Sequence, residues 1–423
     1  MSGRPAEPSY AVISWDGGNF PAGSDAWSST PKRVDPVVRV ITPETLAAPQ
    51  WMNFFLGSGF DADAQHKAAI VAVLDMGGQI PALNWLPKTT SSATKNCNRG
   101  VWSSMDQAWV IVGNGGNDFA AISKDYGRSW ADLATASTTA LVDVAADASG
   151  NLVFIATGSR STTKATRTGY AAFTFATTAN ALTVAPSGGS LTFDAAHATF
   201  IACYRNGALG MKVDTSTNGT AWTARTIPAA WTSYTGTAQS PHITSNAAGT
   251  TVACFFDDVA GLLRFARSTD GGTTWNDVQD SSPGMSATAQ LVVRPTYDDV
   301  NGIWYVGIST DFGGTRQAQV WKSTDDGVTW TSAALFALAN DILIHGLVSL
   351  GSLLTLADDR GRIALSIDNG ATWKWCAANP QTTAGTDATP LGLRGGGGGL
   401  ILLNAPDRVA YASIRFGTDG QAV

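Results

Sequence analysis

An eight-residue pattern, Ser-x-Asp-x-Gly-x-Thr/Ser-Trp, recurs along this chain and limits what it can fold into. Each copy follows a stretch of alternating apolar residues, which is the pattern of a half-buried β-strand. Within the octet, Ser and Asp side chains can hydrogen-bond nearby backbone amides, and Gly supplies the positive φ of a tight reversal. We therefore predict a hairpin turn, with the closing Trp packed between neighbouring sheets. Full octets cover 123–130, 268–275, 323–330 and 366–373, and a degenerate copy covers 215–222.

The residues expected to build these turns are the Ser, Asp, Gly and Trp positions of each octet. They are Ser123, Asp125, Gly127, Trp130, Gly219, Trp222, Ser268, Asp270, Gly272, Trp275, Ser323, Asp325, Gly327, Trp330, Ser366, Asp368, Gly370 and Trp373. Their predicted role is structural and not catalytic.

The spacing of the octets predicts a propeller. Successive closing tryptophans are separated by 92, 53, 55 and 43 residues. A four-stranded propeller blade takes about 46 residues, so the first interval holds two blades and one octet, near Phe175, has been lost. The period predicts an all-β chain with a seven-bladed propeller of four-stranded antiparallel blades, whose radial closure leaves only short sheet edges. The expected blades are 96–137, 138–186, 187–230, 231–283, 284–337, 338–380 and 381–423.

From about Asn96 onward the repeated octets resemble the Asp-box (BNR-repeat) proteins of the sialidase-like β-propeller superfamily. The resemblance implies that each octet is the hairpin between the third and fourth strands of a blade. It also implies that the octets lie away from the face where such proteins act. The family includes sialidases, xyloglucan hydrolases, binding propellers and virion proteins, so the resemblance indicates a fold and leaves the activity open.

Residues 1–95 lack the blade pattern and are predicted to form a separate segment before the propeller at 96–423. The strand-like stretch 9–14 is expected to complete the last blade, for which 389–417 supplies only three strands. Some helix is expected within 42–76, where Pro43 suits a first helical turn and Gly77 a stop. Five aromatic residues of this segment either pack on the propeller or anchor another subunit; they are Trp51, Phe54, Phe55, Phe60 and Trp85.

The composition argues against some classes of function but does not identify one. Of the 423 residues, 44% are hydrophobic and 14% charged, which is ordinary globular usage. A net charge of −6 argues against a nucleic-acid groove, and no apolar run is long enough to span a membrane. The first residues also lack the pattern of a secretory signal.

Metal and cofactor sites are not expected from the cysteines and histidines. The four cysteines are far apart, and Cys203 and Cys254 occupy matching places in apolar strands, as small core residues do. The four histidines are isolated and do not form a zinc-binding pattern. We therefore predict no cofactor, no metal and no disulfide framework.

The residues also argue against the enzymes of the resembled family. A sialidase needs a Glu to activate its Tyr nucleophile, yet the only glutamates are Glu7 and Glu44, both before the propeller. Arg294-Pro295 does not match the spaced Arg-Ile/Leu-Pro motif of those enzymes. The inverting xyloglucan hydrolases use two aspartates across a cleft between two propellers, and this chain is long enough for one. We therefore expect that the chain is not an enzyme.

A binding face is expected opposite the octets, where the loops between second and third strands carry charged residues. These are Arg205, Asp257, Asp258, Asp311, Asp358, Asp359 and Arg360. They are predicted to form a partial acidic ring that binds sugar hydroxyls, a cation or a basic partner. The alternative is that these aspartates only begin turns and solvate loops.

These observations favour a non-catalytic binding or assembly protein. The leading hypothesis is a bacteriophage virion component, in the tail or as a surface decoration with receptor binding, located in the phage particle. Its expected partners are other virion proteins, further copies joined through the N-terminal segment, and host-surface glycan. The alternative is an extracellular glycan-binding protein or Asp-dependent glycoside hydrolase of the Asp-box type.

Overall fold

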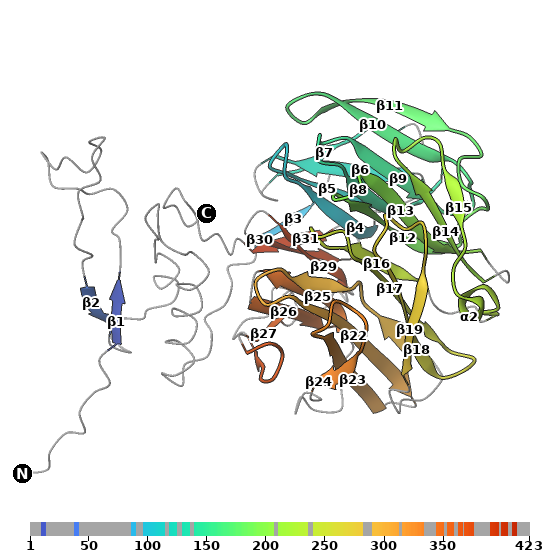
Figure 1. The fold of residues 1–423 in the computed structure, drawn as a ribbon. Helices are drawn as coiled ribbons and strands as arrows, with labels where there is room; N and C mark the ends of the chain where they lie inside the picture. Colours follow the sequence, from blue (N-terminus) through green and yellow to red (C-terminus); the bar gives the residue numbers. More distant parts are fainter. Residues whose placement is uncertain are drawn as a thin grey trace, which may run out of the picture.

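The fold was obtained as a computed structural model, which describes most of the chain from residue 86 and two short strands before it (Figure 1). The described residues are 10–13, 38–41, 86–89, 96–114, 118–124, 129–135, 139–206, 210–235, 240–281, 290–312, 315–333, 344–350, 353–358, 363–366, 368–375, 390–396, 399–404 and 408–412. The predicted helix within 42–76 lies outside these ranges.

Seven antiparallel sheets of four or five strands follow one another from residue 96 onward, and we number them as blades 1 to 7. Blade 1 is β4 (Asn96–Ser103), β5 (Ala108–Asn114), β6 (Asp118–Ser123) and β7 (Ala131–Asp132). Blade 2 is β8 (Leu141–Ala146), β9 (Leu152–Ala156), β10 (Thr162–Gly169) and β11 (Ala172–Thr178). Blade 3 is β12 (Gly188–Asp194), β13 (Thr199–Arg205), β14 (Met211–Ser216) and β15 (Thr223–Arg225). Blade 4 is β16 (His242–Ser245), β17 (Thr251–Asp257), β18 (Leu262–Ser268) and β19 (Asn276–Ser281).

The remaining blades continue the same up-and-down order. Blade 5 is β20 (Gln290–Val292), β21 (Thr296–Asp298), β22 (Ile303–Phe312), β23 (Thr315–Ser323) and β24 (Thr331–Ala333). Blade 6 is β25 (Ile344–Leu350), β26 (Leu353–Asp358), β27 (Ile363–Ser366) and β28 (Lys374–Trp375). Blade 7 is β29 (Pro390–Gly396), β30 (Gly399–Asn404) and β31 (Arg408–Ala412), completed by β3 (Leu86–Thr89). A short helix, α2 (Ala229–Thr232), lies between blades 3 and 4.

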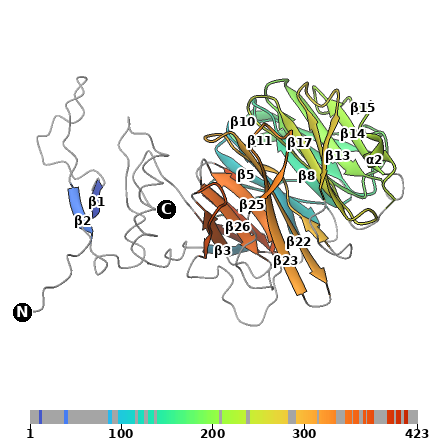
Figure 2. The same ribbon diagram turned by 60° about the horizontal axis from the view of Figure 1, so that its bottom comes forward.

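The blades close into a ring around their first strands (Figures 1 and 2). Strand β8 contacts β4 and β12, β12 contacts β16, and β29 contacts both β25 and β4. Strand β20 joins blade 5 to β17 on one side and to β25 on the other. The ring is therefore continuous from blade 7 back to blade 1.

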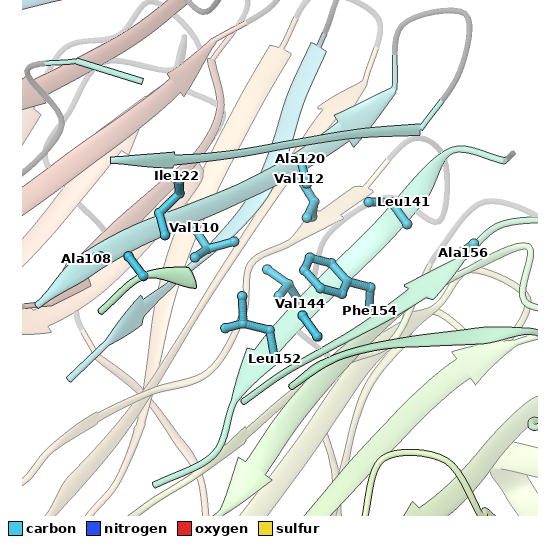
Figure 3. Close-up of a cluster of buried hydrophobic side chains, with 12 residues drawn as sticks. Ala108, Val110, Val112, Ala120, Ile122, Leu141, Val144, Leu152, Phe154 and Ala156 are labelled. Carbon is cyan, nitrogen blue, oxygen red and sulfur yellow. The ribbon is translucent and has the colours of Figure 1, made fainter. Parts of the chain in front are cut away.

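Each blade is buried on both faces because it lies between two others. For this reason the second strands are largely apolar, and every residue of β9 and β17 is buried. Figure 3 shows the contact between blades 1 and 2, where apolar side chains from the two sheets meet face to face. The cluster includes Val110, Val112, Ile122, Val144, Leu152 and Phe154. Most of the described hydrophobic clusters likewise join two neighbouring blades, so the hydrophobic effect acts largely between blades.

The predicted closing strand is wrong. Strand β1 (Tyr10–Ile13), in the stretch expected to complete the last blade, pairs instead with β2 (Val38–Ile41). The fourth strand of blade 7 is β3, whose Leu86 lies opposite Tyr411 and whose Thr89 lies opposite Arg408. Six residues separate β3 from β4, which makes β3 the strand of the N-terminal segment nearest to the start of blade 1.

The fold-class prediction also needs correction in its details. It expected uniform four-stranded blades, but the inner strand of blade 5 is split into β20 and β21, giving five strands. Pro295 lies in the gap, and proline cannot donate to a sheet ladder. In the N-terminal segment the described elements are the strands β1, β2 and β3, and the expected helix stays a prediction. The chain is all-β with almost no helix among the described residues.

Candidate functional site

Three of the four full octets form the same hydrogen-bonded turn between the third and fourth strands of a blade. In blade 5, Ser323 Oγ donates to Asp325 Oδ1 (2.7 Å) and accepts from the Gly327 amide (2.9 Å). Thr329 donates to Asp325 through its amide (2.8 Å) and its hydroxyl (2.6 Å), and Trp330 Nε1 donates to Gly327 O (3.1 Å). The octets 268–275 and 366–373 repeat these contacts. The octet polar groups are thus used within the turn.

Glycine is required in this turn by its backbone and by its neighbours. Gly327 has φ +86°, and a Cβ added there would lie 2.8 Å from Val252 Cγ2 of blade 4. The residue before it also has a positive φ, and this position holds Gly271, Asp326 and Asn369 in the three octets. Asp and Asn tolerate this left-handed conformation better than most residues. The backbone conformation at the fourth octet position therefore explains why that position holds Gly, Asp or Asn.

The other two octets differ from this pattern or lie partly outside the described residues. In the first, Asp125 and Gly127 lie outside the described ranges, Ser123 is buried and Trp130 is half-buried. In the degenerate copy, Asn218 takes the place of the aspartate and accepts hydrogen bonds from the Thr220 and Ala221 amides (2.9 and 2.8 Å).

The degenerate octet also uses its glycine and tryptophan in different ways. The Gly219 amide still donates to a serine, Ser216 Oγ (2.8 Å), as in the full octets. Trp222 Nε1, however, donates to Thr162 Oγ1 of blade 2 (3.3 Å) instead of the octet glycine. The degenerate turn is therefore held together locally in the same way but is fastened to its neighbouring blade by a different bond.

The octet aspartates predict a loss of stability in acid. Partial burial acts to raise the pKa of Asp325, but hydrogen bonds from Thr329 and Ser323 outweigh it and hold the pKa below its ordinary value. Because the folded pKa is depressed, this stabilisation is present above the unfolded value of about 3.9 and is lost as pH falls through the folded pKa. Asp325→Asn should therefore cost roughly 1 kcal/mol at neutral pH, and the difference from wild type should shrink in acid. Urea unfolding at several pH values measures it; a difference independent of pH contradicts the assignment.

The residues of the predicted acidic ring lie at equivalent places in four consecutive blades. Arg205, Asp257 and Asp358 are the last residues of the second strands of blades 3, 4 and 6, and Asp311 is the last but one in blade 5. Asp359 and Arg360 lie outside the described residues. These four residues therefore lie at or next to the ends of second strands.

Their contacts favour turn formation over an open ligand site. Asp257 is 5% exposed, accepts from the Val259 and Ala260 amides (3.1 and 2.9 Å), and pairs with Arg264 Nε (2.8 Å). Asp358 is fully buried.

Two further members, Asp258 and Arg205, also make contacts within the fold. Asp258 accepts from the Tyr234 hydroxyl (2.8 Å), and Arg205 Nε donates to Ser187 Oγ (3.2 Å). Ligand binding by this ring stays a prediction.

Charged residues do meet at the centre of the ring, where the sequence analysis had assigned no site. We call Arg99, Asp143, Ser190 and Arg294 the axial cluster. Asp143 is fully buried, and its Oδ2 accepts from Ser190 Oγ (3.0 Å) and the Leu191 amide (2.8 Å). Its Oδ1 accepts from the Val144 amide (2.9 Å). The carboxylate of blade 2 is therefore fixed by the inner strand of blade 3.

Arg294 extends this network across blades 2 to 5. Its guanidinium comes from the break between β20 and β21, and Nη1 lies 3.4 Å from Asp143 Oδ2 in blade 2. Nη2 donates to Leu191 O in blade 3, and Nε donates to Ile243 O in blade 4 (2.8 Å). One side chain thus joins four of the inner strands, which is consistent with the fixed fork of guanidinium donors.

Arg99 adds a second positive charge from blade 1. Burial lowers the pKa of Arg99; Asp143 opposes this effect and Arg294 adds to it. Arg99 and Asp143 each follow a bulge in their inner strand, between Cys97 and Arg99 and between Leu141 and Asp143. A bulge redirects the following side chain, and we infer that this is how both residues come to lie in the axial cluster.

The axial cluster is arranged to hold strands together. Both oxygens of Asp143 accept hydrogen bonds, and Oδ2 also lies beside the guanidinium of Arg294, so the carboxylate is held in one position by its neighbours. No group of three or more His, Cys, Asp or Glu within the described ranges could hold a metal ion. No helix in the described part of the chain has the length and apolarity to cross a bilayer.

Comparison with protein families and with curated proteins gives no match to this sequence. Solved structures do match the fold. YCF48 bound to D1 peptide superposes with a TM-score of 0.55 at 13% identity, covering 79% of this chain and 97% of that one. A catalytically inactive virginiamycin B lyase from Staphylococcus aureus with quinupristin gives 0.57 at 12%, covering 78% and 99%. The Cps50 (Swd1) β-propeller domain of Myceliophteria thermophila gives 0.53 at 9%, covering 78% and 100%.

These likenesses and the ring of sheets define the chain as a β-propeller. At such low identity they show the fold alone.

Proposed function

We propose that this chain is a non-catalytic binding and assembly propeller of the Asp-box type, and that it serves as a bacteriophage virion component. The observation that carries the proposal is the axial cluster. The centre of the ring is spanned by Arg294, and the carboxylate beside it makes three contacts that join strands, to Ser190, Leu191 and Arg294. A residue used in this way stabilises a scaffold and does not serve as a general acid or base.

The attachment of the N-terminal segment supports an assembly role. Strand β3 completes blade 7, so the residues before it are joined to the outer strand of a rigid blade. That preceding sequence is rich in aromatic residues, which are enriched where proteins bind one another. Propellers with bound peptide, such as the YCF48 complex, show that this fold can present a binding surface. By analogy, the ring would present the surface and the N-terminal segment would join it to the particle.

The particle itself provides the test. Phage particles encoding this chain, purified by density gradient, should contain it at a fixed stoichiometry by quantitative mass spectrometry. A host cytoplasmic protein measured in the same gradient fractions controls for adventitious carry-over. Recovery of the chain only in the lysate or medium would contradict the virion assignment. Release of reducing ends from polysaccharide by the purified chain would contradict the non-catalytic assignment and favour a glycoside hydrolase.

A further inference from the structure

Blade 2 ends in an outer strand unlike those of the other blades. Strand β11 has seven residues, Ala-Phe-Thr-Phe-Ala-Thr-Thr, with neither a charge nor a proline. The outer strands β7, β15, β24 and β28 have only two or three residues. The longer β3 contains Pro87 and Lys88, and β19 contains Asp277 and Asp280. Short length, charge and proline are the means by which sheet edges avoid pairing, and β11 has none of them.

The outer edge of β11 is open in the described structure. Strand β11 stands last in the order of its sheet and pairs only with β10 among the described strands, and Figure 1 shows it at the outer rim. Ala172, Thr174, Ala176 and Thr177 are exposed. Alternate residues of an antiparallel edge strand point their N–H and C=O groups away from the sheet. This edge therefore offers backbone donors and acceptors to a further strand.

The hairpin that carries this edge is held in place at its tip. It replaces the missing octet: the turn between β10 and β11 falls at 169–172, and Phe175 lies within the strand. Asp106 of blade 1 accepts from Arg167 Nε (2.7 Å) and from the Ala171 amide (2.9 Å). Phe175 packs near Phe154, with ring centroids 6.3 Å apart. Because the hairpin is fixed at its tip and on one face, β11 loses little conformational entropy when it pairs with another strand.

We propose that β11 pairs antiparallel with β11 of a second copy, about a two-fold axis at Phe175, to form a dimer with a continuous eight-stranded sheet. Around this axis Phe175 faces its own equivalent, Thr174 faces Ala176 of the second copy, and Phe173 faces Thr177. Aromatic and Thr pairs of this kind stabilise adjacent strands, and like charges would oppose them. Because the segment carries no charge, it is compatible with its own copy, as an isologous interface requires. The pairing also occupies the outer edge of β11 in both copies, so this edge is not available to a third copy.

The dimer rests on the proposed assembly role and names one partner, a second copy of this chain. It is tested on the purified full chain, whereas the virion role is tested on particles, so either can fail without the other. Sedimentation equilibrium of the wild-type chain should show a reversible monomer–dimer equilibrium. Thr174→Lys places a charge at the edge and should raise the dimer dissociation constant by about tenfold or more. Thr223→Lys, on the exposed outer strand β15, adds the same charge elsewhere and should leave the constant unchanged.

Cysteine cross-linking tests the register of the pairing independently. A mixture of Thr174→Cys and Ala176→Cys chains should give covalent dimers under mild oxidation, because those positions face each other across the axis. Each variant alone should give fewer, since its own equivalent lies diagonally. The proposal is overturned by a wild-type chain that stays monomeric throughout, by a dimer that Thr174→Lys leaves unchanged, or by a mixture that cross-links no better than the single variants.

Discussion

Replacing Arg294 with alanine is expected to lower the free energy of unfolding by about 3–5 kcal/mol. The substitution leaves the Asp143 carboxylate fully buried without its pairing with Arg294, and removes donors from Leu191 O and Ile243 O. Among the described residues, it also removes the only side chain that joins blades 2, 3, 4 and 5. Arg294→Lys should recover only part of the loss, because one ammonium cannot reproduce the guanidinium fork. Urea unfolding followed by far-ultraviolet circular dichroism measures both variants.

Arg225→Ala is the matched control for Arg294. Its Nε donates one hydrogen bond, to Thr215 Oγ1 (2.7 Å), in the outer part of blade 3. The same change in charge and volume should therefore cost about 1 kcal/mol or less there. Combining Asp143→Ala with Arg294→Ala should cost less than the sum of the two, since each removes the other's partner. Equal destabilisation by Arg294→Ala and Arg225→Ala would contradict the axial role.

Replacing Trp330 with alanine should have an effect of similar size, about 3–5 kcal/mol. The indole is 2% exposed and stacks on Phe265 of blade 4, with ring centroids 4.1 Å apart and an interplanar angle of 8°. The variant leaves a cavity between blades 4 and 5 and removes the hydrogen bond to Gly327 O. Trp330→Phe should lose less, because it keeps a ring against Phe265. Denaturant unfolding followed by circular dichroism avoids the change in tryptophan fluorescence.

Trp222→Ala provides the comparison for Trp330. Trp222 closes the degenerate octet, is only half-buried, and bonds to Thr162 instead of its own octet glycine. Its removal should therefore cost clearly less than that of Trp330. If both variants are destabilised equally, the stacked contact between blades 4 and 5 is not the source of the effect.

The octets could be predicted from sequence because their contacts are local. Ser323, Asp325, Gly327 and Trp330 lie within eight residues and satisfy one another, so the chain specifies the turn before the ring forms. The same locality explains why a shortened copy at 215–222 could be recognised.

The candidate site could not be predicted in the same way. Arg294 and Asp143 are 151 positions apart, and neither belongs to a distinguishing sequence motif. The available signals were weak ones: a charged residue within an otherwise apolar inner strand, and Pro295 marking the break at which Arg294 leaves the sheet. Asp257 and Asp358 were expected near the turns after second strands, but whether a carboxylate there is exposed or buried depends on residues such as Arg264 that pack beside it.

The sequence by itself determined the all-β class, the period of the blades and the geometry of the octet turns, because strand alternation and turn chemistry act over a few residues. Only the tertiary structure decided which N-terminal strand completes blade 7, which residues meet on the axis, and that β11 keeps an open edge. The first two features depend on ring closure, which brings together strands from opposite ends of the chain, and the third depends on which strand ends its sheet.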